Sequence, residues 1–356
     1  LFVFLEISSI SAYALIAAGP DRRALHAAYK YLIMGSIGAT FIVIGIGMMY
    51  AMTGTLNMAD LAQRLPEVSS RTVSVAFAFL TVGISLKLAL FPLHLWLLDA
   101  YTFAPSAVTV FLASTATKVA VYMLVRFFFS IFGPEFSLEV MAFQWVLLPL
   151  ALIAVLSASL TAIYQMNVKR LLAYSSVAQI GYMILGVSLA SVTGLTAGLL
   201  HLFNHALIKG ALFMAMGCVM YQVGSVRMEA MRGLGKKMPW TMAAFVLGGL
   251  SLIGVPGTVG FISKWYLVLA AVEAGMWVVA ALVLIGSLMA VAYVWKVVEA
   301  AYFQEYKGEF EVRQAPVSLL APTWALVAAN LYFGVNATLT SGVATRAAEV
   351  LLGVGP

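Results

Sequence analysis

Seven ionisable residues of this chain lie inside apolar stretches, where their side chains could carry protons. They occupy five stretches: Glu6, Lys87, Lys118, the set His201, His205 and Lys209, and Lys264. An ionisable side chain at the centre of a bilayer costs about 2.5 to 3.5 kcal/mol or more, so it persists chiefly where it faces an interior path or a partner. The pattern predicts a route for charge through a transporter core.

Glu6 and Lys87 are predicted to pair. Glu6 lies about twelve residues before the expected helix end at Gly19, which is roughly 18 Å and places it near mid-membrane. A lysine at similar depth on a neighbouring helix would let both groups stay charged, because opposite charges stabilise each other's ionised forms. The alternative is a static pair that only fixes helix packing.

Lys118 lies at the centre of the next apolar stretch, FLASTATKVAVYMLVR. Ser114, Thr115 and Thr117 surround it in sequence and could hold water. Burial disfavours the charged form of a lysine, so a modest change in its neighbours can make it release or accept a proton near neutral pH. We predict proton transfer from Lys87 to Lys118. The alternative is a lysine that snorkels to the interface.

His201, His205 and Lys209 recur at every fourth residue of HLFNHALIKGALFM. At about 100° per residue this spacing drifts only about 40° per step, so the three side chains share one helix face. Histidine's ordinary pKa near 6.5 suits it to a proton relay. Metal binding is disfavoured, because HLFNH has no carboxylate between its histidines and no nearby acid offers a third ligand. Structural histidines with satisfied hydrogen bonds remain the other alternative.

Two apolar stretches carry proline and glycine signals that predict interrupted helices. Pro92 follows Lys87 by five residues, and Pro256 precedes Lys264 in GVPGTVGFISKWYL. Freed backbone groups are tolerated in a membrane only beside protein or a water-filled cavity, so paired broken helices indicate a transport site. The alternative is a plain proline kink.

Residues beside the breaks have weaker assignments. Pro92 and Pro256, together with His94 and Asp99 after the first break, are predicted to gate access. Lys264 is predicted to pass protons outward, with pairing to an acid of another subunit as the alternative.

Composition identifies the environment of these groups. The chain has 356 residues, of which 63% are hydrophobic and 10% charged, whereas soluble proteins are usually about 45 to 50% apolar. A spanning helix needs about 20 mostly apolar residues. We predict an all-α, multi-pass protein of the cell inner (plasma) membrane, with about ten transmembrane helices. The predicted helices cover 1–18, 29–52, 73–98, 106–131, 141–164, 171–190, 194–222, 240–270, 275–303 and 317–336.

The net charge of +6 lies largely in loops. It therefore orients the chain in the membrane and does not imply a nucleic-acid partner. The positive-inside rule places the first, fifth, seventh and ninth loops in the cytoplasm. Their basic residues are Arg22, Arg23, Lys30, Lys169, Arg170, Arg227, Arg232, Lys236, Lys237, Lys307 and Arg313.

Several chemistries lack their signatures in this chain. Cys218 is the only cysteine, so the chain can form neither a disulfide framework nor a cysteine-based metal site. The motifs GxxxxGK[ST], HExxH and GxSxG are absent. We therefore expect a transporter with no stand-alone catalytic site, no cofactor and no resident metal. The chain opens inside an apolar stretch without an initiator methionine, so we expect it to be the C-terminal part of a longer protein.

The spaced motifs resemble the antiporter-like membrane subunits shared by Mrp-type cation/proton antiporters and proton-pumping NADH:quinone oxidoreductase. The matching segments are FVFLEISSISAYAL, LKLALFPLHLWLLDAY, STATKVAVYMLVR, NVKRLLAYSSVAQIGYM, HLFNHALIKGALF and GVPGTVGFISKWYL. Within this family the chain is most similar to the D-type subunit of the Mrp-type antiporters. By resemblance, the family's Glu and Lys pair corresponds to Glu6 and Lys87, its connecting lysine to Lys118, and its terminal lysine or glutamate to Lys264.

The resemblance also implies an architecture. The family has fourteen helices with two inverted five-helix repeats, each containing a broken helix. Residues 1–131 are expected to hold the remainder of the first repeat, residues 141–303 the second repeat, and residues 317–336 the final transmembrane helix.

The predicted function is proton movement coupled to export of Na+ or another monovalent cation, within a complex of further membrane subunits in the lipid bilayer. One alternative is a proton-pumping subunit powered by electron transfer in partner subunits of an NADH:quinone oxidoreductase or hydrogenase-type complex, in which case the chain would be part of a translocase. Another is a scaffold subunit that assembles partners without conducting.

Overall fold

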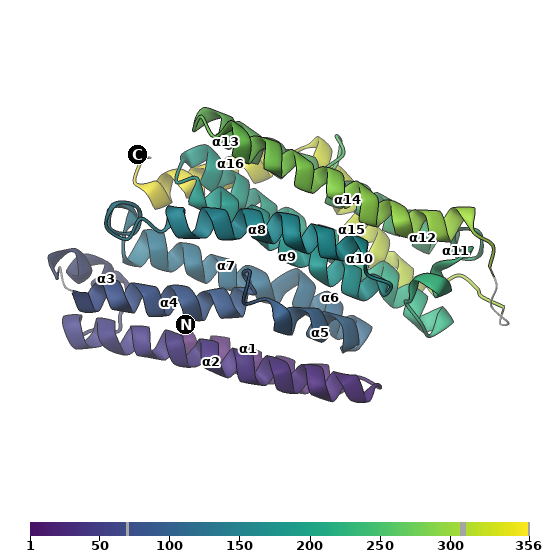
Figure 1. Cartoon of the computed structure of the whole chain (residues 1–356), viewed down its shortest axis with the longest axis horizontal. Helices are drawn as coiled ribbons and strands as arrows, with labels where there is room; N and C mark the ends of the chain where they lie inside the picture. Colours follow the sequence, from purple (N-terminus) through teal and green to yellow (C-terminus); the bar gives the residue numbers. More distant parts are fainter. Residues whose placement is uncertain (69–70, 307–310, 355–356) are drawn as a thin grey trace.

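The computed structural model describes residues 1–68, 71–306 and 311–354, and it is a bundle of helices that run roughly side by side (Figure 1). Lys307, one of the loop residues that predict the orientation, lies outside the described residues. Outside the helices, the described residues include an isolated bridge between Asn167 and Arg227. The helices are α1 (Phe2–Ala17), α2 (Arg22–Thr53), α3 (Met58–Arg64), α4 (Arg71–Leu88), α5 (Leu95–Phe103), α6 (Ser106–Phe111), α7 (Thr117–Val125), α8 (Gln144–Ile163), α9 (Val168–Ser188), α10 (Val192–Val223), α11 (Leu234–Lys237), α12 (Pro239–Ile253), α13 (Val259–Glu273), α14 (Trp277–Phe303), α15 (Val317–Val335) and α16 (Thr338–Leu352).

Length and composition confirm the predicted fold class. Among the described residues, eight helical segments are long and apolar enough to cross a membrane, and α1 and α12 are shorter apolar helices. The segment of 26 residues that contains α6 and α7 is continuous through a π-helical turn at Leu112–Ala116. The predicted total of about ten spanning helices stays a prediction.

Both predicted interruptions are present. The stretch predicted at 73–98 divides into α4 and α5, and the stretch predicted at 240–270 divides into α12 and α13. At the first break, Ala89 has φ 60°, in the left-handed region. At the second break, Gly254 follows the last residue of α12 and has φ 94°, a conformation that glycine adopts without steric cost.

Other predicted boundaries differ from the structure. Helix α2 begins at Arg22 rather than residue 29, because the Asp21 side chain accepts from the Arg23 amide at 2.9 Å and caps the helix before the apolar run begins. Helices α3 and α16 were not predicted. Their sequences are too short and too polar to satisfy a criterion based on membrane spans.

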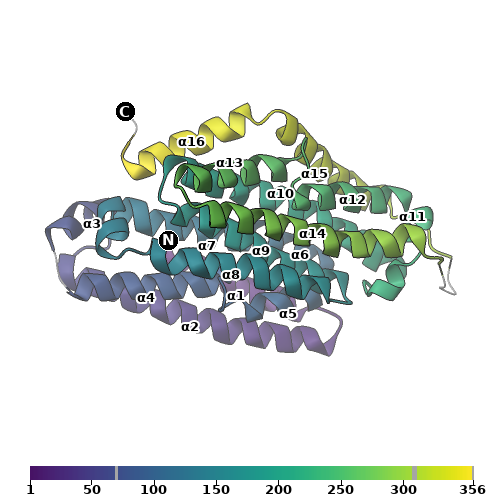
Figure 2. The same cartoon turned by 45° about the horizontal axis from the view of Figure 1, so that its top comes forward.

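Helix α10 is the central element of the C-terminal half. It packs against α9, α12, α13, α15 and α16, and Figure 2 shows α16 continuing along the same side of the bundle as α13. On the other side, α2 packs against α1, α4 and α5. Helix α9 lies between the two halves, and 94% of its apolar window is buried inside the chain.

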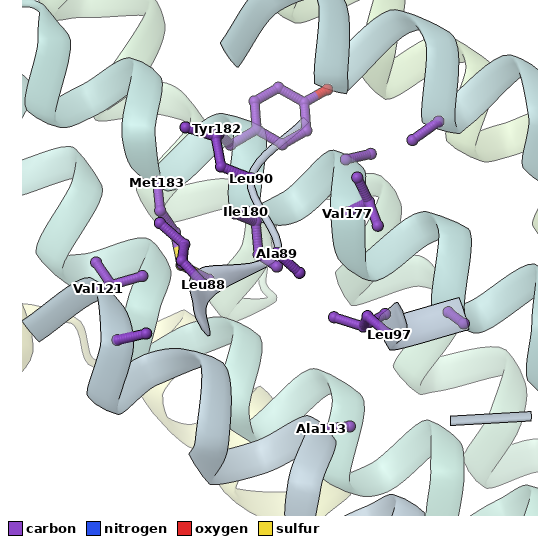
Figure 3. Packing of buried hydrophobic residues seen from close by; sticks show 14 of the residues in the cluster. Leu88, Ala89, Leu90, Leu97, Ala113, Val121, Val177, Ile180, Tyr182 and Met183 are labelled. Atoms are coloured by element: carbon purple, nitrogen blue, oxygen red, sulfur yellow. The ribbon is translucent and has the colours of Figure 1, made fainter. Parts of the chain in front are cut away.

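The first break packs directly on α9. Figure 3 shows Leu88, Ala89 and Leu90 of the break beside Ile180 and Met183 of α9. All five residues are fully or almost fully buried. The first break is thus part of the core rather than a surface loop.

Close approach of α2 and α4 depends on glycine. A Cβ on Gly83 would lie 2.7 Å from the carbonyl oxygen of Gly38 and 2.9 Å from the backbone nitrogen of Ile42. Small residues allow such contact between membrane helices. We expect Gly83→Ala to destabilise the fold by about 1 to 3 kcal/mol through overpacking. A Cβ on Gly47 of α2 would meet nothing within 4 Å, so Gly47→Ala is the control. Equal melting temperatures of the two variants in detergent would contradict the expectation.

Candidate functional site

The predicted contact between Glu6 and Lys87 is present. The Lys87 ammonium donates to Glu6 Oε1 at 2.7 Å and to Ser9 Oγ at 2.9 Å. The Lys87 side chain is 4% exposed and the Glu6 side chain is 24% exposed, so the lysine is buried and the glutamate is partly exposed. Ser9 was not predicted as a partner, although its position three residues after Glu6 places both on one helix face.

Helix α4 ends one residue after Lys87. A cation in the last turn of a helix is favoured by the helix dipole, and here it lies at the interruption of the helix. The Trp96 indole of α5 donates to the Leu86 carbonyl oxygen of α4 at 2.9 Å, so this hydrogen bond links the two helices on either side of the break. Lys87 therefore lies in the last turn of α4, and its ammonium binds the Glu6 carboxylate of α1.

Two residues predicted as gates have different surroundings. His94 is buried, its ring stacks on Phe91 with centroids 5.4 Å apart, and its Nδ1 has no hydrogen-bond partner among the described residues. Asp99 accepts from Lys30 at 2.8 Å and from Arg170 at 3.3 Å. The sequence indicated Lys30 and Arg170 only as orienting loop charges. The structure places them on α2 and α9, where they bind Asp99 of α5.

Removing the Asp99 carboxylate should weaken the contact of α5 with α2 and α9. Asp99→Asn leaves Lys30 and Arg170 without their shared anion, and we expect a loss of about 1 to 3 kcal/mol, between the values for exposed and buried pairs. Thermal unfolding in detergent measures the loss. The control is Asp60→Asn, which breaks the more exposed pair with Arg64. A larger drop for the control would rule out a tethering role for Asp99.

A cavity of about 360 Å³ lies beside Lys87. Residues of α1 line one side, including Ser9, and residues from Leu112 to Met123 line the other. The cavity therefore lies between Lys87 and the segment that carries Lys118, although the Lys118 side chain itself does not line it.

Lys118 is buried and bonds only neutral groups among the described residues. Its ammonium donates to the Ala113 carbonyl oxygen, inside the π-helical turn, and to Thr117 Oγ1 at 3.4 Å. The predicted polar surroundings are only partly present, because Thr115 is exposed and donates to its own helix at Phe111. π-helical turns are frequent at functional sites, and this one presents a carbonyl to the lysine.

The three predicted stations on α10 are all buried. The rings of His201 and His205 are stacked with centroids 6.3 Å apart, as expected for one helix face. Lys209 donates to the Leu172 carbonyl oxygen at 2.9 Å and to Ser175 Oγ. Helix α10 also packs against α7, which carries Lys118, and against the π-helical turn Leu112–Ala116 that precedes it.

The two histidines differ in their partners. His201 Nδ1 lies 2.8 Å from Ser263 Oγ, and its Nε2 lies 2.9 Å from Gln179 Oε1. Neither nitrogen of His205 has a partner among the described residues, and buried groups of this kind ordinarily bind ordered water. Gln179 and Ser263 were not predicted, because polar residues inside apolar stretches give no sign of which helix they face.

Lys264 lies at the second break. Its ammonium donates to the Leu252 carbonyl oxygen at 3.0 Å and the Ile253 carbonyl oxygen at 2.9 Å, and lies 4.9 Å from the centre of the Tyr182 ring. The salt bridges of the described residues do not include Lys264. The described part of the chain also has no group of three or more His, Cys, Asp or Glu that could hold a metal ion.

This arrangement can be compared with known proteins. The family model described as NADH:quinone oxidoreductase/Mrp antiporter, TM, matches residues 1–290. The chain belongs to this family. It is 48% identical over 305 residues to the N-type subunit of NADH-quinone oxidoreductase from Desulforudis audaxviator, which covers 85% of this chain and 60% of that protein. It is 32% identical over 339 residues to the D-type subunit of the Na+/H+ antiporter from Alkalihalophilus pseudofirmus, which covers 94% of this chain and 67% of that protein.

A solved structure of the family's fold agrees. A chain of the membrane-bound sulfane sulfur reductase, an archaeal respiratory membrane complex, superposes with a TM-score of 0.90 and 34% identity over 99% of this chain and 71% of that chain. The predicted family and the multi-pass location in the cell membrane are confirmed. Both kinds of relative named by the prediction, quinone-oxidoreductase and antiporter subunits, match this member of the family, but of these two the N-type subunit, and not the predicted D-type subunit, has the higher identity.

Proposed function

We propose that this chain is a proton-translocating subunit of a multisubunit membrane complex. The observation that carries the proposal is the burial of ionisable side chains on several packed helices: Lys87 with its partner Glu6, Lys118, His201, His205, Lys209 and Lys264. Buried charges of this kind are expensive in a membrane and mark ion paths. A buried lysine that is bound only by neutral groups, as Lys118 and Lys264 are among the described residues, can release or accept a proton without breaking an ion pair.

Proton movement begins at the pair. Separation of Glu6 from Lys87 removes the anion that stabilises the ammonium, so Lys87 releases its proton. The cavity between α1 and the segment around Lys118 brings the proton from Lys87 as far as Ala116 and Val119, the lining residues that flank Lys118. From Lys118 the proton passes to the stations His201, His205 and Lys209.

The end of the route is Lys264, beside His201. Ser263 directly precedes Lys264 and contacts His201, so its hydroxyl joins the α10 stations to the second break. His94 and Asp99, with Pro92 and Pro256 at the breaks, form the proposed gates. One broken helix lies within residues 1–131 and another within residues 141–303. This supports a division into two repeats with these boundaries, and residues 317–336 are then the final transmembrane helix.

The energy source that the sequence predicts is exchange with Na+ or another monovalent cation. The 32% identity to a D-type subunit whose name is that of a Na+/H+ antiporter supports this form. A second candidate is a redox-driven pump, and it is favoured by the 48% identity to an N-type subunit of NADH-quinone oxidoreductase. In both forms the partners are other membrane subunits.

A proton-flux assay in everted vesicles distinguishes cation/proton antiport from redox-driven pumping. The full-length protein and its operon partners are expressed in cells that lack other antiporters, and a pH-sensitive dye records proton flux on adding Na+, K+ or Li+ and, separately, an electron donor. Cation-evoked flux establishes antiport, whereas flux evoked only by the donor establishes redox pumping. An assembled complex that gives neither flux would contradict proton translocation and leave the scaffold role.

A further inference from the structure

A cavity of about 600 Å³ lies where α12 and α15 begin, and no residue of the proposed proton route lines it. Its lining includes Trp240 of α12, Gln314 of the segment before α15, and Val317, Leu320 and Trp324 of α15. Helix α12 packs against both α11 and α15, and Figure 2 shows these three helices toward one end of the bundle. This cavity is called the α12–α15 pocket below.

The walls of the pocket are aromatic and apolar. The rings of Trp240 and Trp324 have centroids 5.8 Å apart and meet nearly edge to face, at 74°. Val317, Leu320 and Trp324 follow one another at spacings of three and four residues, so they share one face of α15. Tryptophan gathers at the membrane–water interface, where its ring meets both apolar chains and polar headgroups. The α12–α15 pocket therefore has the lining expected for a site that opens at that interface.

One polar group of the pocket is held firmly, and another has no partner. The Gln314 side chain donates to Thr241 Oγ1 at 2.6 Å and accepts from the Trp240 amide at 3.3 Å, so it joins the start of α12 to the segment before α15. In contrast, the Trp324 indole N–H is buried and has no hydrogen-bond partner among the described residues. This group can only donate, and buried donors are ordinarily paired. A ligand with an acceptor oxygen would pair it.

Cations flank the pocket. Lys236 and Lys237 lie in the last turn of α11 and are exposed, and neither side chain has a partner among the described residues. Because three residues span at most about 11 Å, the Cα of Lys237 lies within that distance of the Cα of Trp240. Arg313 directly precedes Gln314 and pairs with exposed Glu311 at 3.3 Å, a kind of pair that contributes little. These cations are therefore available to an anion.

We propose that the α12–α15 pocket binds one anionic phospholipid from the cytoplasmic leaflet. The loops that hold Lys236, Lys237 and Arg313 are predicted to be cytoplasmic, and basic pockets between membrane helices on that side bind anionic headgroups. The lipid phosphate binds the two lysines, an ester oxygen accepts from the Trp324 indole, and an acyl chain lies along the apolar face of α15. The site is separate from the proton route, so this inference goes beyond the proposed function and does not depend on it.

Photolabelling by a lipid tests this site. The purified full-length complex is reconstituted into phosphatidylcholine vesicles that contain a small fraction of phosphatidylglycerol with a photoreactive acyl chain, and mass spectrometry locates the label after illumination. A parallel sample contains photoreactive phosphatidylcholine at the same fraction. We expect label on Trp240 or on residues 314–324, and about fivefold or more label from the anionic lipid than from the zwitterionic lipid.

Exposed lysines allow a variant that should fold normally. Lys236→Gln/Lys237→Gln should raise the lipid fraction for half-maximal labelling about thirtyfold, because each lysine near an anionic surface contributes a factor of about five. Arg22→Gln/Arg23→Gln is the matched control, since it removes two adjacent exposed cations at the start of α2, on the opposite side of the bundle (Figure 1). Trp324→Phe keeps an aromatic ring but loses the N–H donor, and should raise the half-maximal fraction about fivefold.

Each result decides for or against the lipid site. Equal half-maximal fractions for the lysine and arginine double variants would overturn it, as would equal labelling by the two photoreactive lipids. Absence of label from the pocket in the assembled complex would also overturn it, because a partner subunit would then cover the pocket. Weakened labelling in the lysine double variant alone, with wild-type melting temperatures in both double variants, would support it.

Discussion

Replacing Lys87 by alanine is expected to lower proton flux in everted vesicles about a hundredfold, the usual effect of losing one positioned proton-transfer group. Lys87 is the buried partner of Glu6 and lies beside the cavity that extends toward Lys118. Without its amine, the proton has no acceptor at the first break. The Glu6 side chain is 24% exposed, so it can take a proton or water when its partner is removed, and the protein should still fold.

Lys87→Arg separates a relay from a static pair. Arginine keeps the positive charge and can still bind Glu6, but it does not release its proton in proteins. A relay at this position predicts flux as low as in Lys87→Ala, together with a melting temperature near that of the wild type. Restored flux in Lys87→Arg would show that only the ion pair is needed, and the proposed transfer from Lys87 would be wrong.

Replacing Lys118 by methionine is expected to have an equally large effect on flux and a small or opposite effect on stability. Lys118 bonds only the Ala113 carbonyl oxygen and Thr117 Oγ1 among the described residues. Methionine has similar length and is apolar, so it removes a buried charge without leaving a buried anion unpaired. The first and second halves of the route would then be disconnected.

Flux and assembly must both be measured for this variant. We expect Lys118→Met complexes to assemble, to melt at the wild-type temperature or above, and to conduct protons about a hundredfold more slowly. The scaffold alternative predicts the opposite result, because replacing Lys118 in a subunit that conducts no protons would not change the proton flux. Wild-type flux through fully assembled Lys118→Met complexes would therefore end the proposal that protons pass this lysine.

The amino-acid sequence by itself determined the environment, the helical class, the two breaks and the buried charges. These follow from local properties, because an apolar run long enough to span, a Pro and Gly interruption, or a lysine far from either helix end is recognisable without neighbours. It also predicted that Glu6 and Lys87 meet, since two opposite charges at one depth each need a partner.

Only the tertiary structure decided which neutral groups hold each charge. Ser9 on Lys87 lies 78 residues away in sequence, whereas Gln179 on His201 and the α12 carbonyls on Lys264 lie on the directly preceding helices. The sequence does not indicate which helix a polar residue in an apolar run will face. It gives no indication at all of which side chain a backbone carbonyl will bind. The local pattern therefore predicted which apolar stretches carry the charges, whereas the contacts of α1 with α4, of α9 with α10 and of α12 with α13 decided their partners.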